Sequence, residues 1–233
     1  MLFALRPDNA VIGDINPELI RVYEAIRDHA DDLVNLLKTC RHDEAFYYSM
    51  RNLDRDPVKF AAMTDLEKAA RTIYLNRTCY NGLYRMNSKG QFNSPFGRHA
   101  NPDIVREDII RAVSGYLNSS NILFKCSEFG PILDSLQAGA FAYLDPPYDP
   151  VSGTANFVTY SKDGFDRYKQ IELRDRCDDL DRRGVKFMLS NSATDFMKDL
   201  YKGYNIDIVK AKRFINSKAD RRGEADEILV TNY

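Results

Sequence analysis

The stretch AFAYLDPPYDP at residues 140–150 constrains the fold of this chain more than any other. Its apolar run, from Ala140 to Leu144, predicts a buried strand of a parallel sheet, and this strand stops abruptly at Asp145. Ligands of open α/β sheets bind beyond the carboxyl ends of the strands. We therefore predict an α/β protein in which Asp145 and Tyr148 lie at a binding pocket.

The turn Asp145-Pro146-Pro147-Tyr148 combines groups that suit an amine. Its two prolines stiffen the backbone and lack N–H donors, so the Pro146 carbonyl oxygen is open as an acceptor. An exocyclic amine could donate one N–H to Asp145 and the other to this carbonyl, while Tyr148 stacks on its ring. Two fixed acceptors would stabilise the charge that develops as a delocalised amine such as adenine N6 attacks. The alternative is an ordinary Asp-Pro surface turn.

Composition excludes several other classes of protein. The 233 residues are enough for one sizeable core, or for one core and a small inserted module. Hydrophobic content is 44%, no apolar run approaches the ~18 residues of a membrane span, and no signal peptide opens the chain. The four cysteines lack C-x-x-C spacing, and only three histidines could join them, so neither a metal site nor a disulfide framework is indicated. We expect a cytoplasmic protein with no membrane partner.

Charge is unevenly distributed, although the net charge is only −1. There is no Asp or Glu between residues 71 and 102, and Asp220 is the one acid between residues 210 and 222. Two local basic patches on a neutral protein suggest an anionic track such as a phosphate backbone, and solvated loops are the alternative. The basic residues are Arg71, Arg77, Arg85, Lys89 and Arg98 in the first patch, and Lys210, Lys212, Arg213, Lys218, Arg221 and Arg222 in the second.

The order of the predicted elements favours a mainly parallel sheet with helices on both faces. A strand at 10–14 ends in Asp14, a residue type that typically accepts from ribose hydroxyls at this place in a nucleotide-binding sheet. Asn16 and Pro17 then begin a helix that extends to about residue 37. Further helices are predicted at 43–53, 64–80, 103–118, 165–183 and 193–202, with another after Phe129. Further strands are predicted at 122–125, 140–144, 185–189, 204–209 and 227–232.

The segment YNGLYRMNSKGQFNSPFGRH at residues 80–99 alternates aromatic side chains with basic and amide ones around three glycines, as a hairpin or loop would. Arginine can bind guanine, asparagine and glutamine can bind adenine, and an aromatic ring can enter a base stack. The alternative is an ordinary Gly/Asn-rich hairpin, and we favour nucleic-acid binding.

Together these segments resemble a Dam-type DNA adenine-N6 methyltransferase of the D12 class, in the branch that methylates GATC. The resemblance covers essentially the whole chain, and its long ordered segments make a chance match very unlikely. It implies transfer of a methyl group from S-adenosylmethionine to an adenine flipped out of double-stranded DNA. The segments are DINPELI at 14–20, NRTCYNGLYRMNSKGQFNSPFGR at 76–98, LDPPYDPVSGTANFVTYSKDGF at 144–165, MLSNS at 188–192 and the closing EILVTNY.

The resemblance also implies roles for single residues. Asp145, Pro146 and Tyr148 would form the catalytic group that holds the adenine, and Asp145 would also lie against the cofactor. Asp14 would bind the cofactor ribose, with Glu128 and Phe129 near the cofactor adenine, although the family usually has Asp where Glu128 stands. Tyr80, Asn81, Leu83 and Arg85 would insert into or read the duplex, with Arg98 and His99 nearby, and His99 stands where the family often has Tyr.

The fold implied by the resemblance is a Rossmann-like class I methyltransferase sheet. Residues 1–41 and 103–233 would form the catalytic domain, and residues 42–102 a mainly helical DNA-recognition insertion. The chain starts after the strand and glycine-rich F-x-G-x-G turn of the family, so its sheet would lack the first, central strand, between those bearing Asp14 and Asp145. We expect a monomeric, N-terminally truncated chain that is inactive or poorly folded unless this segment is supplied.

Two other functions fit the same residues. One is an inactive DNA-binding remnant of such an enzyme, because the glycine-rich cofactor loop is missing. The other is a methyltransferase that acts on RNA or on another planar amine, since the Asp-Pro-Pro-Tyr turn specifies an amine rather than its carrier.

Overall fold

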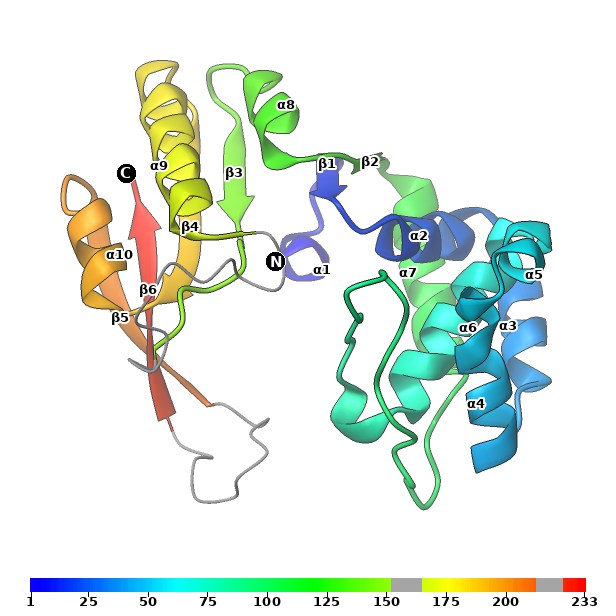
Figure 1. The fold of residues 1–233 in the computed structure, drawn as a ribbon. Helices are drawn as coiled ribbons and strands as arrows, with labels where there is room; N and C mark the ends of the chain where they lie inside the picture. The colour runs from blue at the N-terminus through cyan, green and yellow to red at the C-terminus, as the bar shows by residue number, and fades with distance from the viewer. Residues whose placement is uncertain (152–164, 213–223) are drawn as a thin grey trace. The chain divides into compact units, whose positions relative to one another are not determined.

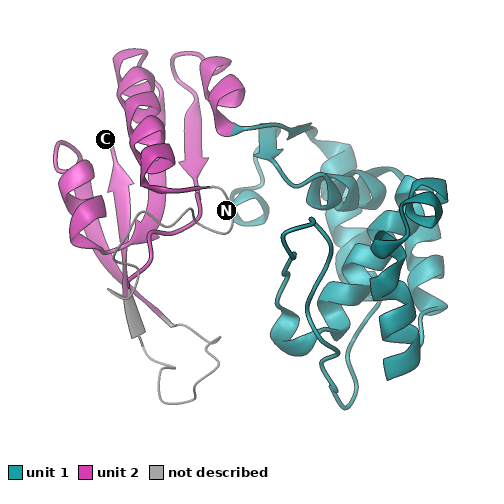
Figure 2. Cartoon of the chain, viewed as in Figure 1, with its two compact units in different colours: residues 1–128 teal, residues 129–233 magenta. Residues whose placement is uncertain are grey.

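The computed structural model describes residues 1–151, 165–212 and 224–233 (Figure 1). The chain divides into two compact units, residues 1–128 and residues 129–233 (Figure 2). Helices and strands occur in both units, so the α/β class is confirmed. The Rossmann-like sheet, its missing strand and the functional domain boundaries stay predictions.

Unit 1 combines a short parallel sheet with a group of helices. Strand β1 (Asn9–Asp14) pairs with β2 (Asn121–Cys126) in parallel, with Asp14 opposite Cys126. The strand predicted at 10–14 is therefore confirmed. The helices of this unit are α1 (Leu2–Leu5), α2 (Pro17–Asp28), α3 (Ala30–Lys38), α4 (Glu44–Asn52), η1 (Leu53–Arg55), α5 (Pro57–Ala62), α6 (Asp65–Thr78), η2 (Tyr80–Gly82) and α7 (Glu107–Ser119).

Local signals account for most helix boundaries in unit 1. The Asn16 side chain accepts the Glu18 N–H at 3.0 Å and caps α2, and Thr64 with Glu67 forms the capping box of α6. The single helix predicted from Pro17 to about residue 37 is wrong, because His29 has non-helical torsions (φ −139°, ψ 38°) and separates α2 from α3. Asp31 and Asp32 follow this break in the first turn of α3, where carboxylates favour a helix start.

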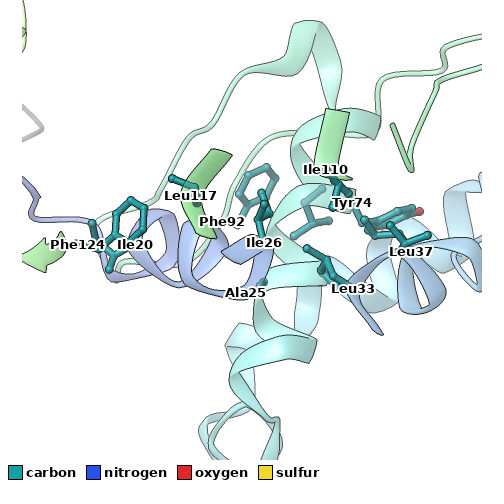
Figure 3. Packing of buried hydrophobic residues seen from close by; sticks show 14 of the residues in the cluster. Ile20, Ala25, Ile26, Leu33, Leu37, Tyr74, Phe92, Ile110, Leu117 and Phe124 are labelled. Atoms are coloured by element: carbon teal, nitrogen blue, oxygen red, sulfur yellow. The ribbon is translucent and has the colours of Figure 1, made fainter. Parts of the chain in front are cut away.

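The core of unit 1 lies where α2 and α3 pack against α6 and α7 (Figure 3). Leu33 and Leu37 of α3 and Tyr74 of α6 are buried there, and Phe92 joins them from the segment after α6. The buried residues of α2 and α3 therefore belong to this core, whereas Leu19 of α2 is exposed.

Unit 2 contains a four-stranded sheet in the order β3-β4-β6-β5, counted over the described residues. Its strands are β3 (Phe141–Leu144), β4 (Lys186–Ser192), β5 (Asn205–Lys212) and β6 (Glu224–Thr231), and its helices are α8 (Phe129–Asp134), α9 (Arg167–Arg182) and α10 (Asp195–Leu200). β3 and β4 are parallel, whereas β6 is antiparallel to both β4 and β5. β3, β4 and β5 therefore run in one direction and β6 alone is reversed, so the prediction of a mainly parallel sheet holds for this sheet except at β6.

Strand β3 is buried on one face rather than on both. Ala142 and Leu144 are buried, whereas Phe141 and Tyr143 are 43% and 39% exposed. The prediction of a strand buried throughout is wrong in this respect, because successive side chains of a strand point to opposite faces and only the face of Ala142 and Leu144 is covered. The core of this unit contains Ala142 and Leu144 of β3, Leu173, Cys177 and Leu180 of α9, Phe187 and Leu189 of β4, Met197 of α10, and Ile228 and Val230 of β6.

Replacing Leu33 by alanine is expected to lower the free energy of unfolding by about 3 kcal/mol, because it leaves a cavity in the core of unit 1. Urea denaturation followed by circular dichroism measures the change. Val58, which is 80% exposed on α5, is the control, and Val58→Ala is expected to change the unfolding free energy by no more than about 0.5 kcal/mol. Equal effects of the two variants would contradict the core assignment.

Candidate functional site

Asp145 lies directly after β3, at the end of the strand predicted to carry it (Figure 1). The Ser190 hydroxyl, on the neighbouring strand β4, donates to Asp145 Oδ1 at 2.9 Å. The Tyr143 hydroxyl is 3.3 Å from Ser190 Oγ, and it is the donor of this second bond because Ser190 has only one proton. One carboxylate oxygen is thus held by a short polar chain, and no described residue donates to the other oxygen, Oδ2.

The two proline carbonyls of the turn differ in whether they accept a hydrogen bond from the protein. Gln170 of α9 donates its Nε2 to the Pro147 carbonyl oxygen at 2.7 Å. Within the described residues, no group donates to the Pro146 carbonyl oxygen. The turn therefore presents two adjacent acceptors without a donor, Asp145 Oδ2 and Pro146 O. A planar amine has two N–H donors to match them.

Tyr148 is half-buried beside these acceptors. Its hydroxyl donates to Glu227 Oε2 on β6 at 3.4 Å. Burial raises the pKa of Tyr148 above its ordinary value, and the negative charges of Asp145 and Glu227 raise it further. The phenol therefore stays neutral at physiological pH, with its hydroxyl anchored to the sheet.

Asp149 fixes the far end of the turn. Its buried carboxylate accepts two bonds from Arg167 at 3.0 and 3.2 Å, and a third from the Thr194 hydroxyl at 2.8 Å. The Asp149 N–H donates to Asn191 Oδ1 at 2.9 Å. Side chains from β4, α9 and the cap of α10 thus hold residues 145–149 in one conformation.

Sequence reasoning quoted the Ser190-Asn191-Ser192 segment but gave it no role, and it missed Gln170, Asp149 and Glu227. For the Ser190-Asn191-Ser192 segment, the order of the strands could have indicated its place beside Asp145. The strand carrying Ser190 follows the strand carrying Asp145 after one helix, and such strands pair in parallel with their carboxyl ends together. The other partners carry no comparable signal in the sequence.

The four residues predicted to bind the cofactor are divided between the units. In unit 1, Asp14 ends β1 and accepts the Asn16 N–H at 2.7 Å, and exposed Glu128 follows β2 at the same edge of the sheet. In unit 2, Phe129 begins α8, with its ring centroid 5.9 Å from that of Phe165. Asp145 belongs to unit 2 as well, and a common cofactor site stays a prediction.

The segment predicted to be a hairpin or loop forms a hairpin, residues 83–94, in unit 1. Met86 and Phe92 form an antiparallel bridge, and the Asn93 N–H donates to the Arg85 carbonyl at 2.7 Å. At the tip, Asn87 Oδ1 accepts the N–H groups of Lys89 and Gln91 at 2.9 and 3.0 Å. Asn87 therefore builds the tip and is not free to bind a base through this oxygen.

The residues predicted to contact DNA differ in their surroundings. Tyr80 is 48% exposed, Asn81 and Arg85 are exposed, and Leu83 is half-buried. Arg98 is exposed, with a guanidinium nitrogen 4.0 Å from a Glu44 carboxylate oxygen. His99 Nε2 is 3.0 Å from the Cys79 carbonyl, so in this arrangement the ring donates to backbone.

One of the five basic residues in the first patch does not belong to a basic surface. Arg71 is buried and its guanidinium is 2.8 Å from the Asp54 carboxylate, and Arg77 donates to the Asp103 carbonyl at 2.9 Å. Including Arg71 in a surface patch was wrong, because its partner Asp54 precedes the acid-free stretch in sequence. Of the second patch, Lys210 lies on β5, Lys212 ends it, and Arg213, Lys218, Arg221 and Arg222 lie outside the described residues.

No helix in the described part of the chain is long and apolar enough to cross a bilayer. The same residues contain no group of three or more His, Cys, Asp or Glu side chains that could hold a metal ion.

Comparison with known proteins identifies relatives along the whole chain. The model of the D12 class N6 adenine-specific DNA methyltransferase family matches residues 1–215. The chain is 41% identical over 235 residues to Type II methyltransferase M1.LlaDCHI of Lactococcus lactis subsp. cremoris, covering 100% of this chain and 82% of the relative. It is 40% identical to Type II methyltransferase M.MjaIII of Methanocaldococcus jannaschii, covering 96% and 80% of the two chains. It is 30% identical to the DNA adenine methylase of Escherichia coli K12, covering 94% and 78%.

Replacing Asp149 by alanine is expected to lower the free energy of unfolding by about 2 kcal/mol, because Arg167 and the half-buried hydroxyl of Thr194 lose their acceptor. Urea denaturation measures this change. The control is Asp199→Ala, which removes a carboxylate that is 78% exposed and is expected to change stability by no more than about 0.5 kcal/mol. A loss no larger than that of the control would mean that Asp149 does not hold the turn.

Proposed function

Since this chain belongs to the D12 class N6 adenine-specific DNA methyltransferase family, we propose that it methylates adenine N6 in double-stranded DNA at GATC, on a base flipped out of the duplex. The observation that carries the proposal is a pair of acceptors to which no described residue donates, Asp145 Oδ2 and Pro146 O, next to the neutral ring of Tyr148. This is the chemistry that an aromatic exocyclic amine requires.

In this proposal the turn acts on the amine in two ways. Asp145 and the Pro146 carbonyl accept its two N–H groups, which orients the nitrogen and stabilises the positive charge that develops on it. Ser190 and Tyr143 keep the other carboxylate oxygen engaged, so the carboxylate cannot rotate freely. Glu227 anchors the Tyr148 ring that supports the base.

The residues predicted to hold S-adenosylmethionine fit such a group. Asp14 Oδ1 accepts the Asn16 N–H, whereas its Oδ2 has no donor among the described residues and can accept from a ribose hydroxyl. The half-buried Phe129 ring offers an apolar contact for a purine. When bound, the cofactor supplies an electrophilic methyl group.

Duplex binding is assigned to the hairpin and its neighbours. Arg85, Lys89 and Arg98 are exposed cations, and no carboxylate interrupts residues 71–102. Exposed Tyr80 and half-buried Leu83 precede Arg85 and suit insertion into a base stack.

A second candidate is a DNA-binding remnant that no longer binds the cofactor. Among the described residues, β1 pairs only with β2, and β3 pairs only with β4. This pairing favours the second candidate. Asp14 and Asp145 therefore follow strands of separate sheets. Calorimetry with S-adenosylmethionine separates the candidates, since the remnant would bind duplex DNA without binding the cofactor.

Replacing Asp145 by alanine is expected to lower the rate of methyl transfer at least about 100-fold, because an acceptor that stabilises developing charge is lost. Transfer of labelled methyl from S-adenosylmethionine to a GATC duplex measures the rate, with an RNA duplex of the same sequence as competitor. Asp207→Asn on β5 is the control and is expected to keep the wild-type rate. Equal rates for Asp145→Ala and wild type would contradict the proposed mechanism.

Replacing Arg85 by glutamine is expected to weaken duplex binding and to reduce the slope of log K against log salt by about 1, because one cation leaves the DNA contact. Fluorescence anisotropy over a range of salt concentrations measures both quantities. Lys59→Gln removes an exposed cation from α5 and serves as the control. If the two variants shifted binding equally, the contact would not be specific to the hairpin.

A further inference from the structure

The hairpin is held from one side by side chains that take the place of a third strand. Its returning arm carries backbone groups at Phe92 and Ser94 that no strand pairs with. Arg55 of η1 donates to the Phe92 carbonyl at 2.9 Å, and Tyr47 and Arg51 of α4 donate to the Ser94 carbonyl at 2.9 and 3.1 Å. An isolated two-stranded hairpin is marginally stable in water, so these bonds help to fix its position together with the buried Phe92 ring.

Asp54 is the centre of this support. Its Oδ2 accepts the Phe92 N–H at 2.7 Å and lies 2.8 Å from Nη2 of Arg71 on α6, and its Oδ1 accepts from Arg55 at 2.6 Å. The side chains of Asp54 and Arg71 are only 9% and 4% exposed. Arg71 also donates to the carbonyls of Met50 and Arg51, at 2.8 and 2.9 Å. One buried ion pair therefore connects the hairpin to α4, η1 and α6.

Apolar contact beneath the hairpin is incomplete. A hollow of about 50 Å³ lies there, lined by Tyr84, Met86 and Phe92 of the hairpin, by Phe60, Thr72 and Leu75 of the helices, and by the charged side chains of Glu18, Asp54 and Arg71. Hydrophobic contact therefore does not fill the space between the hairpin and the helices completely. The directional bonds to Asp54 and its neighbours help to fix the position of the hairpin.

Displacement of the returning arm would also move Arg85, which is proposed to bind DNA. Phe92 bridges Met86, and the Asn93 N–H donates to the Arg85 carbonyl at 2.7 Å. Hydrogen bonds to base edges depend on direction and on distances of a few tenths of an ångström, whereas attraction to phosphates is far less directional. A shifted hairpin would therefore lose base selectivity before it lost general affinity for DNA.

We propose that Asp54 and Arg71 are positioning residues for DNA sequence recognition, and that the selectivity of the hairpin depends on this buried pair although neither residue touches DNA. This inference rests on the proposed binding of double-stranded DNA. It does not depend on cofactor binding or on methyl transfer.

The test is Asp54→Asn, measured as the ratio of affinities for a duplex with one GATC site and for the same duplex with that site scrambled. This ratio is expected to fall at least about 10-fold, the loss of one good base contact. Affinity for the scrambled duplex and its salt slope are expected to stay at their wild-type values, because Arg85, Lys89 and Arg98 are retained. A purely structural role would leave the ratio unchanged as long as the variant is folded.

Asp56→Asn is the matched control. It removes the same charge two residues away, and asparagine replaces aspartate equally well as the cap of α5. Its affinity ratio is expected to equal that of the wild type. A fall as large as that of Asp54→Asn would overturn the inference, because net charge would then explain both.

A milder variant covers the case in which Asp54→Asn does not fold, as judged by circular dichroism. Tyr47→Phe keeps the buried ring and removes only the bond to the Ser94 carbonyl, so a fall of a few-fold in the ratio is expected. Wild-type ratios in the folded variants would overturn the inference.

Wild-type protein that discriminates between the duplexes but transfers no methyl group would contradict the proposed activity and leave the positioning role intact. Equal binding of both duplexes by the wild type would contradict the proposed GATC target and this inference together.

Discussion

The parallel pairing of β3 with β4 is the constraint on which the site in unit 2 depends. With Leu144 opposite Leu189, the residues that follow, Asp145 and Ser190, come into hydrogen-bond contact. The same pairing brings Asn191 to the backbone of Asp149. A slip of one residue would turn every side chain of β3 to the opposite face and would remove Ser190 from the carboxylate. The buried side chains of Ala142 and Leu144 oppose such a slip, so the core sets the site.

Both candidate functional elements are irregular segments that depend on side chains from regular ones. The turn at 145–149 is held by Ser190, Gln170 and Thr194, and the hairpin is held by residues of α4, η1 and α6. In each case a buried aspartate accepts several donors, Asp149 in unit 2 and Asp54 in unit 1. A buried carboxylate is costly unless its lone pairs are satisfied, so it tolerates few alternative arrangements. This intolerance makes a loop rigid enough to present functional groups.

The acceptors of the turn fall into two groups: those that the protein itself bonds hold the conformation, and those that it leaves open are suited to bind a ligand. The Pro147 carbonyl and Asp145 Oδ1 have protein donors, and each contributes to the conformation. The Pro146 carbonyl and Asp145 Oδ2 have none among the described residues. An acceptor that is exposed to water can hydrogen-bond to water, so it costs little free energy when no ligand is bound. The pair is therefore suited to exchange water for an amine. The membership of the chain in an adenine-specific methyltransferase family gives that amine its identity.

Local sequence determined much of this protein. The cap at Asn16, the capping box at Thr64, the strand before Asp145 and the hairpin tip at Asn87 follow from neighbouring residues, and all could be predicted as elements. Tertiary structure alone decided that Arg71 is buried against Asp54, that β6 runs antiparallel to β4, and that Gln170 and Asp149 hold the turn. The physical reason is that a capping bond forms within one turn of chain, whereas the partner of a buried charge or strand edge comes from whichever distant segment the core brings beside it.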